Sequence, residues 1–328
     1  MIKLILISIT LNFVLIFFYK RLNFFSVYNH EKSKSISLIG GNIIIINFIV
    51  FFVYSIVFDK EILVEFFSQK RQLYSFLIAS IGIYLMGVFD DKYNLNPMTK
   101  IFVMLFFIIF VILGDNNLFI YILKFQTFEI SLGVYSLFFS AFCFLVFINA
   151  INMFDGINLQ VSFYSIFILI YLFLNFFHPY FCLFLIISIL SFSILNAKNI
   201  SFLGNSGSHF LGFLFSYLLI KFYNLNINFI YAEEIILLML IPGLDMLRVS
   251  SKRIISGNNP LKGDINHLHH IIKNKTNSNY ALLINFVITI LPIIIHEFLK
   301  FQLIHIILIG ILVYYSVFLF FRKNNILE

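Results

Sequence analysis

Long apolar runs separated by short polar connections recur along the whole chain. A transmembrane helix needs a run of roughly 20 apolar residues, so we expect an all-α polytopic membrane protein with about 10–11 transmembrane helices. The predicted helices cover residues 4–19, 36–58, 73–89, 100–113, 134–148, 159–177, 181–197, 207–222, 235–250, 280–296 and 302–321.

The same pattern predicts a single integral membrane domain over residues 1–328. No soluble domain interrupts the apolar runs, and the longest polar connection, a predicted cytoplasmic loop near 251–279, is too short to bury a core of its own. The first run has no small-residue cleavage site before Lys20 and Arg21. We therefore expect a retained helix rather than a removed signal peptide.

Composition excludes an ordinary soluble domain, because 61% of the residues are hydrophobic and only 11% are charged. The net charge of +7 is better explained by loop charges that orient a membrane protein than by a nucleic-acid partner. Most of the 22 Lys and Arg residues lie on one side of the predicted helices, which the positive-inside rule assigns to the cytoplasm. The polar clusters described next all lie on that side, so we expect a cytoplasmic-face active site.

An acidic pair, Asp90-Asp91, ends the third apolar run in the stretch MGVFDDKYNLNPMTK. Consecutive helical residues do not face each other, so we expect the two carboxylates to have different partners. One could hold a metal or a lysine, such as Lys92 or Lys100, while the other meets a substrate. The alternative is a solvated helix end, where acidic residues are ordinary.

A lone carboxylate, Asp155, is the only Asp, Glu, Lys or Arg between Glu129 and Lys198. Such a charge in an apolar segment must be solvated, neutralised or matched from elsewhere. Asn149 and Asn152 add amide oxygens near the same helix end. This oxygen-rich group suits a hard cation such as magnesium. The alternative is a capping Asp in a water-exposed loop.

Two further polar stretches allow two interpretations each. In SFLGNSGSHFLGF, residues 201–213, small residues four apart are typical of close helix packing, but the start of this helix could also attract a phosphate. In PLKGDINHLHHIIK, residues 260–273, Asp264 could cap a short helix on which His267 and His270 share a face. The histidine spacing is not that of a structural zinc site, so a diphosphate or nucleotide grip or a generic surface loop remains.

Together these stretches resemble the polyprenyl-phosphate N-acetylhexosamine-1-phosphate transferases of glycosyltransferase family 4. The HLHH form is similar to the undecaprenyl-phosphate GlcNAc-1-phosphate transferases, whereas the muropeptide branch has three consecutive histidines. The matching motifs, in order, are Gly40-Gly41, Asp90-Asp91 with Lys100, Asn149-x-x-Asn152-x-x-Asp155-Gly156, Phe202-Leu203-Gly204 and Asp264-x-x-His267-Leu268-His269-His270, with Pro242, Asp245, Arg253 and Pro260 on the approach to the last.

The resemblance implies transfer of an N-acetylhexosamine 1-phosphate from a UDP-sugar to undecaprenyl phosphate, with release of UMP. The implied setting is the bacterial inner (plasma) membrane, at the start of lipid-linked cell-envelope polysaccharides such as lipopolysaccharide O-antigen. The implied cofactor is Mg²⁺, with Mn²⁺ as a substitute, and a homodimer is compatible. The implied site residues are Asp90, Asp91 and Asp155 for catalysis; Lys100, Asn149, Asn152, Arg253, His267, His269 and His270 for substrate; and Asp155, Asn205 and Asp91 for the metal.

The chain differs from the usual motifs of this family at three places. The family usually has a metal-binding Asp where this chain has Asn205. It usually has a second Asp-Gly in the segment after Asp155, which here reads Ile157-Asn158-Leu159-Gln160, and a proline before the early Gly-Gly, which is absent here. An Asn oxygen can ligate magnesium but brings no charge, so weaker metal affinity is expected. A catalytically silent homologue that binds a lipid-linked sugar or a partner enzyme is the alternative. A transporter fits less well, because the polar groups gather at one face and no internal repeat is visible.

Overall fold

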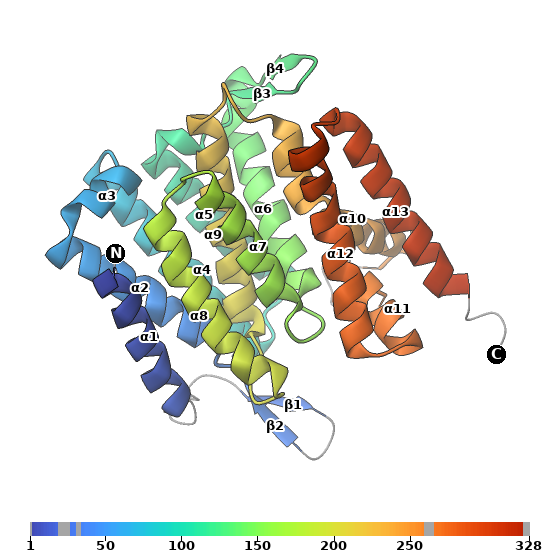
Figure 1. Ribbon diagram of the computed structural model, residues 1–328, viewed down its shortest axis with the longest axis horizontal. Coiled ribbons are helices and arrows are strands. Elements are labelled where there is room, and N and C mark those ends of the chain that lie inside the picture. The colour runs from blue at the N-terminus through green and yellow to red at the C-terminus, as the bar shows by residue number, and fades with distance from the viewer. Residues whose placement is uncertain (1, 19–26, 31–33, 259–265, 324–328) are drawn as a thin grey trace. The chain divides into compact units, whose positions relative to one another are not determined.

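The computed structural model describes residues 2–18, 27–30, 34–258 and 266–323. These residues form an all-α protein, and each of the eleven predicted apolar segments coincides with a helix (Figure 1). These helices are α1 (Ile2–Phe17), α2 (Gly40–Phe58), α4 (Lys70–Tyr93), α5 (Pro97–Gly114), α6 (Ser136–Phe154), α7 (Gln160–Leu174), α8 (Pro179–Ala197), α9 (Gly204–Leu225), α10 (Ala232–Ile255), α12 (Ser278–Leu299) and α13 (Leu303–Lys323).

Seven helical stretches of the described chain are long and apolar enough to cross a membrane, which makes this a multi-pass membrane protein. Of the other four, α1 and α7 are apolar but shorter, and α9 and α10 are longer but more polar. The total of about 10–11 spans therefore stays a prediction. The seven stretches are Gly40–Phe58, Lys70–Tyr93, Pro97–Gly114, Gly133–Phe154, Pro179–Ala197, Ser278–Leu299 and Leu303–Arg322.

Several short elements were not predicted by the apolar pattern. They are too short for hydrophobic periodicity to reveal them. Two antiparallel hairpins join neighbouring strands in sequence, with Val27 opposite Ser37 in the first and Ile122 opposite Ser131 in the second. The short elements are α3 (Lys60–Phe66), α11 (Leu268–Lys275), the 3₁₀ turns η3 (Asn116–Leu118) and η4 (Gly133–Tyr135), and the strands β1 (Val27–His30), β2 (Lys34–Ser37), β3 (Ile122–Lys124) and β4 (Glu129–Ser131).

The chain separates into two compact units, and each is described by itself. Unit 1 comprises Met1–Asn116 and Val161–Phe215, and unit 2 comprises Asn117–Gln160 and Ser216–Glu328. The prediction of a single domain stays a prediction.

The interior of unit 1 contains a cluster of phenylalanine rings, a residue type of which the chain has 46. The Phe48 ring meets the rings of Phe52 and Phe76 edge-on, with centroids 4.9 and 5.5 Å apart. Phe51 and Phe181 form a similar pair at 5.0 Å. Edge-to-face pairs of this kind add about 0.5–1.5 kcal/mol to the burial of their area. They join α2 to α4 and α8, while α1 lies along α2 and α8 (Figure 1).

A buried amide pair links α1 to α2. Asn12 and Asn47 exchange two side-chain hydrogen bonds of 2.9 and 3.0 Å, and both are almost fully buried. We expect Asn47→Leu to lower the free energy of unfolding by about 1–2 kcal/mol, because the Asn12 carbonyl oxygen loses its donor. The double variant Asn12→Leu/Asn47→Leu should lose less than the sum of the two single variants. Equilibrium unfolding in mixed detergent micelles measures both, and strictly additive losses would contradict the pairing.

Unit 2 is a set of packed helices that carries the histidine segment. α10 packs against α6, α12 and α13, and the short helix α11 packs against α12 and α13. Figure 1 shows α12 and α13 side by side, with α11 beside one end of α12. α11 begins directly after His267, which is its N-cap residue. The histidine motif therefore forms the first turn of a packed helix rather than a solvated loop.

Candidate active site

In unit 1, the carboxylate of Asp90 forms an ion pair with Lys100. Oδ2 of Asp90 lies 2.7 Å from Nζ of Lys100, and Oδ1 accepts a 3.0 Å hydrogen bond from the backbone N–H of Leu95. Asp90 is only 1% exposed, whereas the side chain of Lys100 is 26% exposed. The last turn of α4 and the first turn of α5 thus hold this pair together, and the lysine is the partner that solvent reaches.

The neighbouring Asp91 has a different partner, as expected for consecutive helical positions. Its two oxygens accept the backbone N–H groups of Asn205 and Ser206, at 2.8 and 3.0 Å. Asp91 therefore caps the N-terminus of α9, where a carboxylate is electrostatically favourable. These are two of the amides that the sequence suggested for phosphate binding. Gly204, which begins the helix, has φ of +76°, and an added Cβ would lie 2.9 Å from Asp91 Oδ2.

Asn205 itself lies inside this cap. Besides its N–H, its backbone oxygen accepts a 2.7 Å hydrogen bond from Nδ1 of His209, which is buried. Asp91 and Asn205, both predicted metal residues, are thus brought together in unit 1. The signal that could have revealed His209 is its spacing of four residues from Asn205 on the same helix.

In unit 2, the C-terminal end of α6 carries Asn149, Asn152 and Asp155. Asp155 is the C-cap residue and half-buried, and its backbone N–H donates to Asn152 O at 3.3 Å. The amide of Asn149 donates to Leu145 O of its own helix at 2.8 Å. The predicted oxygen-bearing side chains therefore gather at one helix end, as the sequence suggested.

The turn after Asp155 packs directly on His269. A Cβ added at Gly156 would lie 1.8 Å from Nε2 of His269, so only glycine leaves room for the ring. On its other side the ring meets Gln160, whose Nε2 lies 3.4 Å from His269 Nδ1. Burial, and next the neighbouring charge of His270, hold the pKa of His269 well below its usual value. His269 is therefore a neutral ring at pH 7.

Gly156→Ala should displace this ring. We expect the rate of the reaction at this site to fall about 100-fold, because a misplacement of roughly 1 Å in a site can have that effect. Gly243→Ala on α10 is the matched control, since no atom lies within 4 Å of its added Cβ and alanine favours helix. Steady-state kinetics of both purified variants measure the difference. Equal activity of the two would show that the Gly156 contact with His269 is dispensable.

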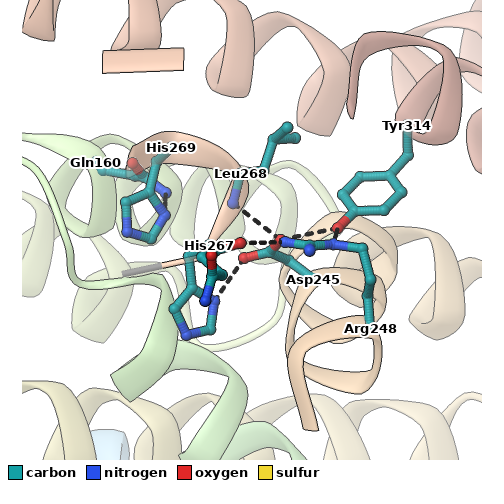
Figure 2. Close-up of polar contacts among 8 residues, drawn as sticks. Gln160, Asp245, Arg248, His267, Leu268, His269 and Tyr314 are labelled. Atoms are coloured by element: carbon teal, nitrogen blue, oxygen red, sulfur yellow. Dashed lines mark hydrogen bonds and ion pairs between the residues drawn. The ribbon is translucent and has the colours of Figure 1, made fainter. Parts of the chain in front are cut away.

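Asp245 is the centre of a buried network that holds the histidine segment. Its Oδ2 lies 2.7 Å from Nδ1 of His267, and its Oδ1 accepts hydrogen bonds from Leu268 N, Arg248 Nη2 and Tyr314 Oη at 3.0, 2.8 and 2.8 Å (Figure 2). Tyr314 Oη in turn accepts from Nε of Arg248 at 2.7 Å. Every donor around this carboxylate is thus matched, as a buried charge requires.

This network satisfies the start of α11 from another helix. The sequence suggested that Asp264 would cap the short helix, but that residue and Pro260 lie outside the described residues. In the structure the Leu268 N–H, one of the first-turn donors that a helix leaves open, is bonded by Asp245 of α10.

Other predicted residues take less defined positions. Arg253 is half-buried in the last turn of α10, where a cation suits the helix dipole, and His270 lies beside His269 with ring centroids 4.3 Å apart. Arg248 bonds the histidine segment through Asp245 and through Asn266 O, the latter at 2.6 Å. The spacing Asp245-x-x-Arg248 on a helix could have revealed it. No sequence signal pointed to Tyr314.

The predicted metal residues offer only oxygen ligands, which is the chemistry that magnesium prefers. The two oxygens of Asp91 accept the backbone N–H groups of Asn205 and Ser206, and the side chain of Ser206 is also bonded to this carboxylate. Each of these oxygen donors by itself suits Mg²⁺, and the assignment of Asp91, Asn205 and Asp155 as its ligands stays a prediction.

Comparison with known proteins confirms the resemblance. Residues 73–223 match the family described as glycosyl transferase family 4. The chain is similar to proteins named undecaprenyl-phosphate alpha-N-acetylglucosaminyl 1-phosphate transferase, with 25% identity over 223 residues in Escherichia coli O157:H7 and 26% over 219 residues in Yersinia pestis. These alignments cover 64% and 62% of this chain and 60% of each relative. The chain thus spans about 60% of the length of the curated relatives it matches.

Proposed function

We propose that this chain, which carries a glycosyl transferase family 4 region at residues 73–223, transfers a hexosamine 1-phosphate from a UDP-sugar to a polyprenyl phosphate. An oxygen of the lipid phosphate attacks the β-phosphorus of the UDP-sugar. A new P–O–P bond forms, the bond from the β-phosphorus to the bridging oxygen breaks, and UMP leaves with that oxygen. The product is a lipid diphosphate that carries the sugar.

The observation that supports this proposal best is the buried ion pair Asp90–Lys100 inside the matched region. Ionisable side chains at the end of an apolar helix cost free energy, and in membrane proteins they are usually functional. Lys100 is the exposed partner and a suitable cation for a phosphate, and Asp90 holds it in place.

The geometry favours positioning over proton removal for Asp90. Both of its oxygens are engaged, by Lys100 and by Leu95 N, so its contacts assign it to holding the lysine and not to the role of proton acceptor. The lipid phosphate does not need one, because the second pKa of a phosphate monoester is near 6 and the group is largely dianionic at pH 7. Holding the dianion in line with the β-phosphorus accounts for most of the rate that the protein must supply.

The other predicted residues are proposed to bind the metal or the nucleotide-sugar. Asp91 orders the start of α9 and, with Asn205 and Asp155, is a candidate magnesium ligand. When bound, magnesium would offset the charge of the diphosphate oxygens. Asn149, Asn152, Arg253 and the histidines His267, His269 and His270 are proposed contacts of the nucleotide-sugar.

UMP release by the purified chain in detergent tests the proposal. The assay contains undecaprenyl phosphate, a panel of UDP-N-acetyl sugars, and Mg²⁺ or Mn²⁺ over a range of concentrations. Release that requires both lipid and metal is the expected result, with UDP-GlcNAc as the first sugar to try. No release with any sugar would instead favour the silent homologue that binds a lipid-linked sugar or a partner enzyme.

A carboxylate restored at position 205 should lower the magnesium concentration that the reaction requires. We expect Asn205→Asp to lower the magnesium concentration for half-maximal rate about 10-fold, because the carboxylate adds a full negative charge. The titration of UMP release against Mg²⁺ measures this shift. An unchanged requirement would exclude Asn205 as a ligand.

The cellular setting follows from the same reading. We infer a bacterial inner-membrane enzyme with its active site on the cytoplasmic side, where UDP-sugars are available. Its product would begin a lipid-linked envelope polysaccharide such as O-antigen.

A further inference from the structure

We propose that His267 and His269 are held in opposite tautomers, His267 by Asp245 and His269 by Gln160. The two side chains then present one hydrogen-bond acceptor and one donor to the ligand. Asp245 and Gln160 are positioning residues in this proposal, which rests on the proposed function only for the identity of the ligand.

The tautomer of His267 follows from its partner. A carboxylate oxygen can only accept, so the 2.7 Å contact with Asp245 Oδ2 places a hydrogen on His267 Nδ1 (Figure 2). Arg248 already balances the charge of Asp245 at 2.8 Å. With its hydrogen on Nδ1, the imidazole of His267 leaves a lone pair on Nε2 that can accept a hydrogen bond.

The tautomer of His269 follows in the opposite sense. In the orientation that the amide of Gln160 has in the structure, its nitrogen lies 3.4 Å from His269 Nδ1 and its buried Oε1 has no hydrogen-bond partner among the described residues. An amide nitrogen can only donate, so in this orientation His269 Nδ1 is the acceptor and the hydrogen lies on Nε2. His269 is 1% exposed. Within the described part of the chain, its buried Nε2 has no hydrogen-bond partner. A buried donor without an acceptor is unfavourable, which points to a ligand atom as its partner.

The two rings lie side by side, so one ligand can contact both of them. The rings of His267 and His269 are parallel within 1°, with centroids 5.6 Å apart. Nε2 of His269 packs on Gly156, the residue after Asp155. A ligand must therefore offer an acceptor oxygen to His269 and a hydroxyl or N–H group to His267. A nucleotide-sugar carries both, as phosphate oxygens and as hydroxyl groups.

The direct test is the ¹⁵N NMR spectrum of the histidine rings in the purified chain, because protonated and unprotonated ring nitrogens resonate far apart. The chain has eight histidines. The spectra of His267→Asn and His269→Asn variants assign the two signals by their loss. We expect Nδ1–H for His267 and Nε2–H for His269 at pH 7. The same tautomer in both rings, or a charged His269, would overturn the proposal.

Gln160→Leu extends the test. It removes the donor at similar volume, so His269 should lose its preference for Nε2–H while the His267 signal stays unchanged. The KM for the UDP-sugar should rise about five- to tenfold, as expected for one lost hydrogen bond, with a smaller change in kcat. An unchanged His269 signal would show that Gln160 does not set the tautomer.

Gln126→Leu is the matched control. The side chain of Gln126 likewise makes a hydrogen bond, because its Oε1 accepts from Leu303 N at 2.8 Å. Its replacement should leave both histidine signals and the KM unchanged. Because the NMR measurement needs no turnover, absence of UMP release would refute the proposed function without deciding the tautomers, and the two failures are distinguishable.

Discussion

Asp155→Ala is expected to lower UMP release about 1,000-fold or more, at any practical magnesium concentration. Asp155 is the carboxylate that the sequence isolates most clearly, because no other Asp, Glu, Lys or Arg lies between Glu129 and Lys198. It is also a candidate ligand that brings a full charge, which Asn205 does not. The loss should therefore not be recovered by added metal.

The position of Asp155 argues for function rather than stability. It is the C-cap of α6, where the helix dipole presents partial negative charge and a carboxylate is disfavoured. Removing it should leave the fold intact, which gel filtration and a thermal melt of the detergent complex can check. Asp155→Asn, which keeps an oxygen ligand but not the charge, should retain more activity than the Ala variant.

Asp59→Ala is the matched control for this experiment. Asp59 is likewise a half-buried C-cap carboxylate after an apolar helix, α2. Asp59 is also the N-cap residue of α3 but makes no side-chain capping hydrogen bond, so its replacement should leave UMP release within about twofold of the unmodified chain. Retained activity in Asp155→Ala, or equal loss in both variants, would remove the role assigned to Asp155.

Asp245→Ala is expected to have the largest effect on stability, about 3–5 kcal/mol. The substitution removes the acceptor from four donors at once and leaves the guanidinium of Arg248 buried without its charge partner. The side chains of Arg248 and Asp245 are only 10% and 3% exposed, so water cannot replace the lost contacts easily. Transfer activity should be lost as well, because His267 and the start of α11 lose their anchor.

The control variant, Lys300→Met, breaks an ion pair that has the same spacing in sequence but lies exposed to solvent. Lys300 and Glu297 are also three residues apart, at 2.9 Å, with side chains 68% and 47% exposed. Lys300→Met should change stability little, as is usual for surface pairs. Equilibrium unfolding in mixed micelles compares the two variants, and similar small losses would show that the Asp245 network is not a stabilising centre.

Asp245→Asn keeps the experiment informative if the Ala variant does not fold. The amide preserves volume and one acceptor oxygen, so the protein should fold with a smaller loss of stability. The histidine anchor is altered, because the amide nitrogen cannot accept from His267 Nδ1. Activity should therefore fall more than stability, and an Asn variant with full activity would show that this contact is dispensable.

The sequence by itself determined the helical architecture. Lipid offers no hydrogen-bond partners, so an apolar segment that spans it must satisfy its backbone internally, and a helix is how a single segment does so. Each predicted apolar segment is accordingly a helix. The short helix α3 and the two hairpins were missed, because they are too brief to leave a periodic signal, whereas a short helix at the histidine motif was suggested from its polar residues.

The sequence also located most of the polar chemistry but not its contacts. Asp90 and Asp91 were expected to diverge, and the structure gives one to Lys100 and the other to the start of α9. That second partner could not be predicted, because residues far apart in sequence meet only through packing. The helix start proposed for phosphate is bonded by a side chain from another helix.

Only the tertiary structure decided which side chains hold the histidines. Asp245 and Tyr314 are 69 residues apart, and Gln160 and His269 are 109 apart, so no local pattern links them. Gly156 owes its importance to a ring that packs where a Cβ would be. Hydrophobic periodicity reports which face of an element is buried, whereas the partner of a buried polar group depends on which elements pack together.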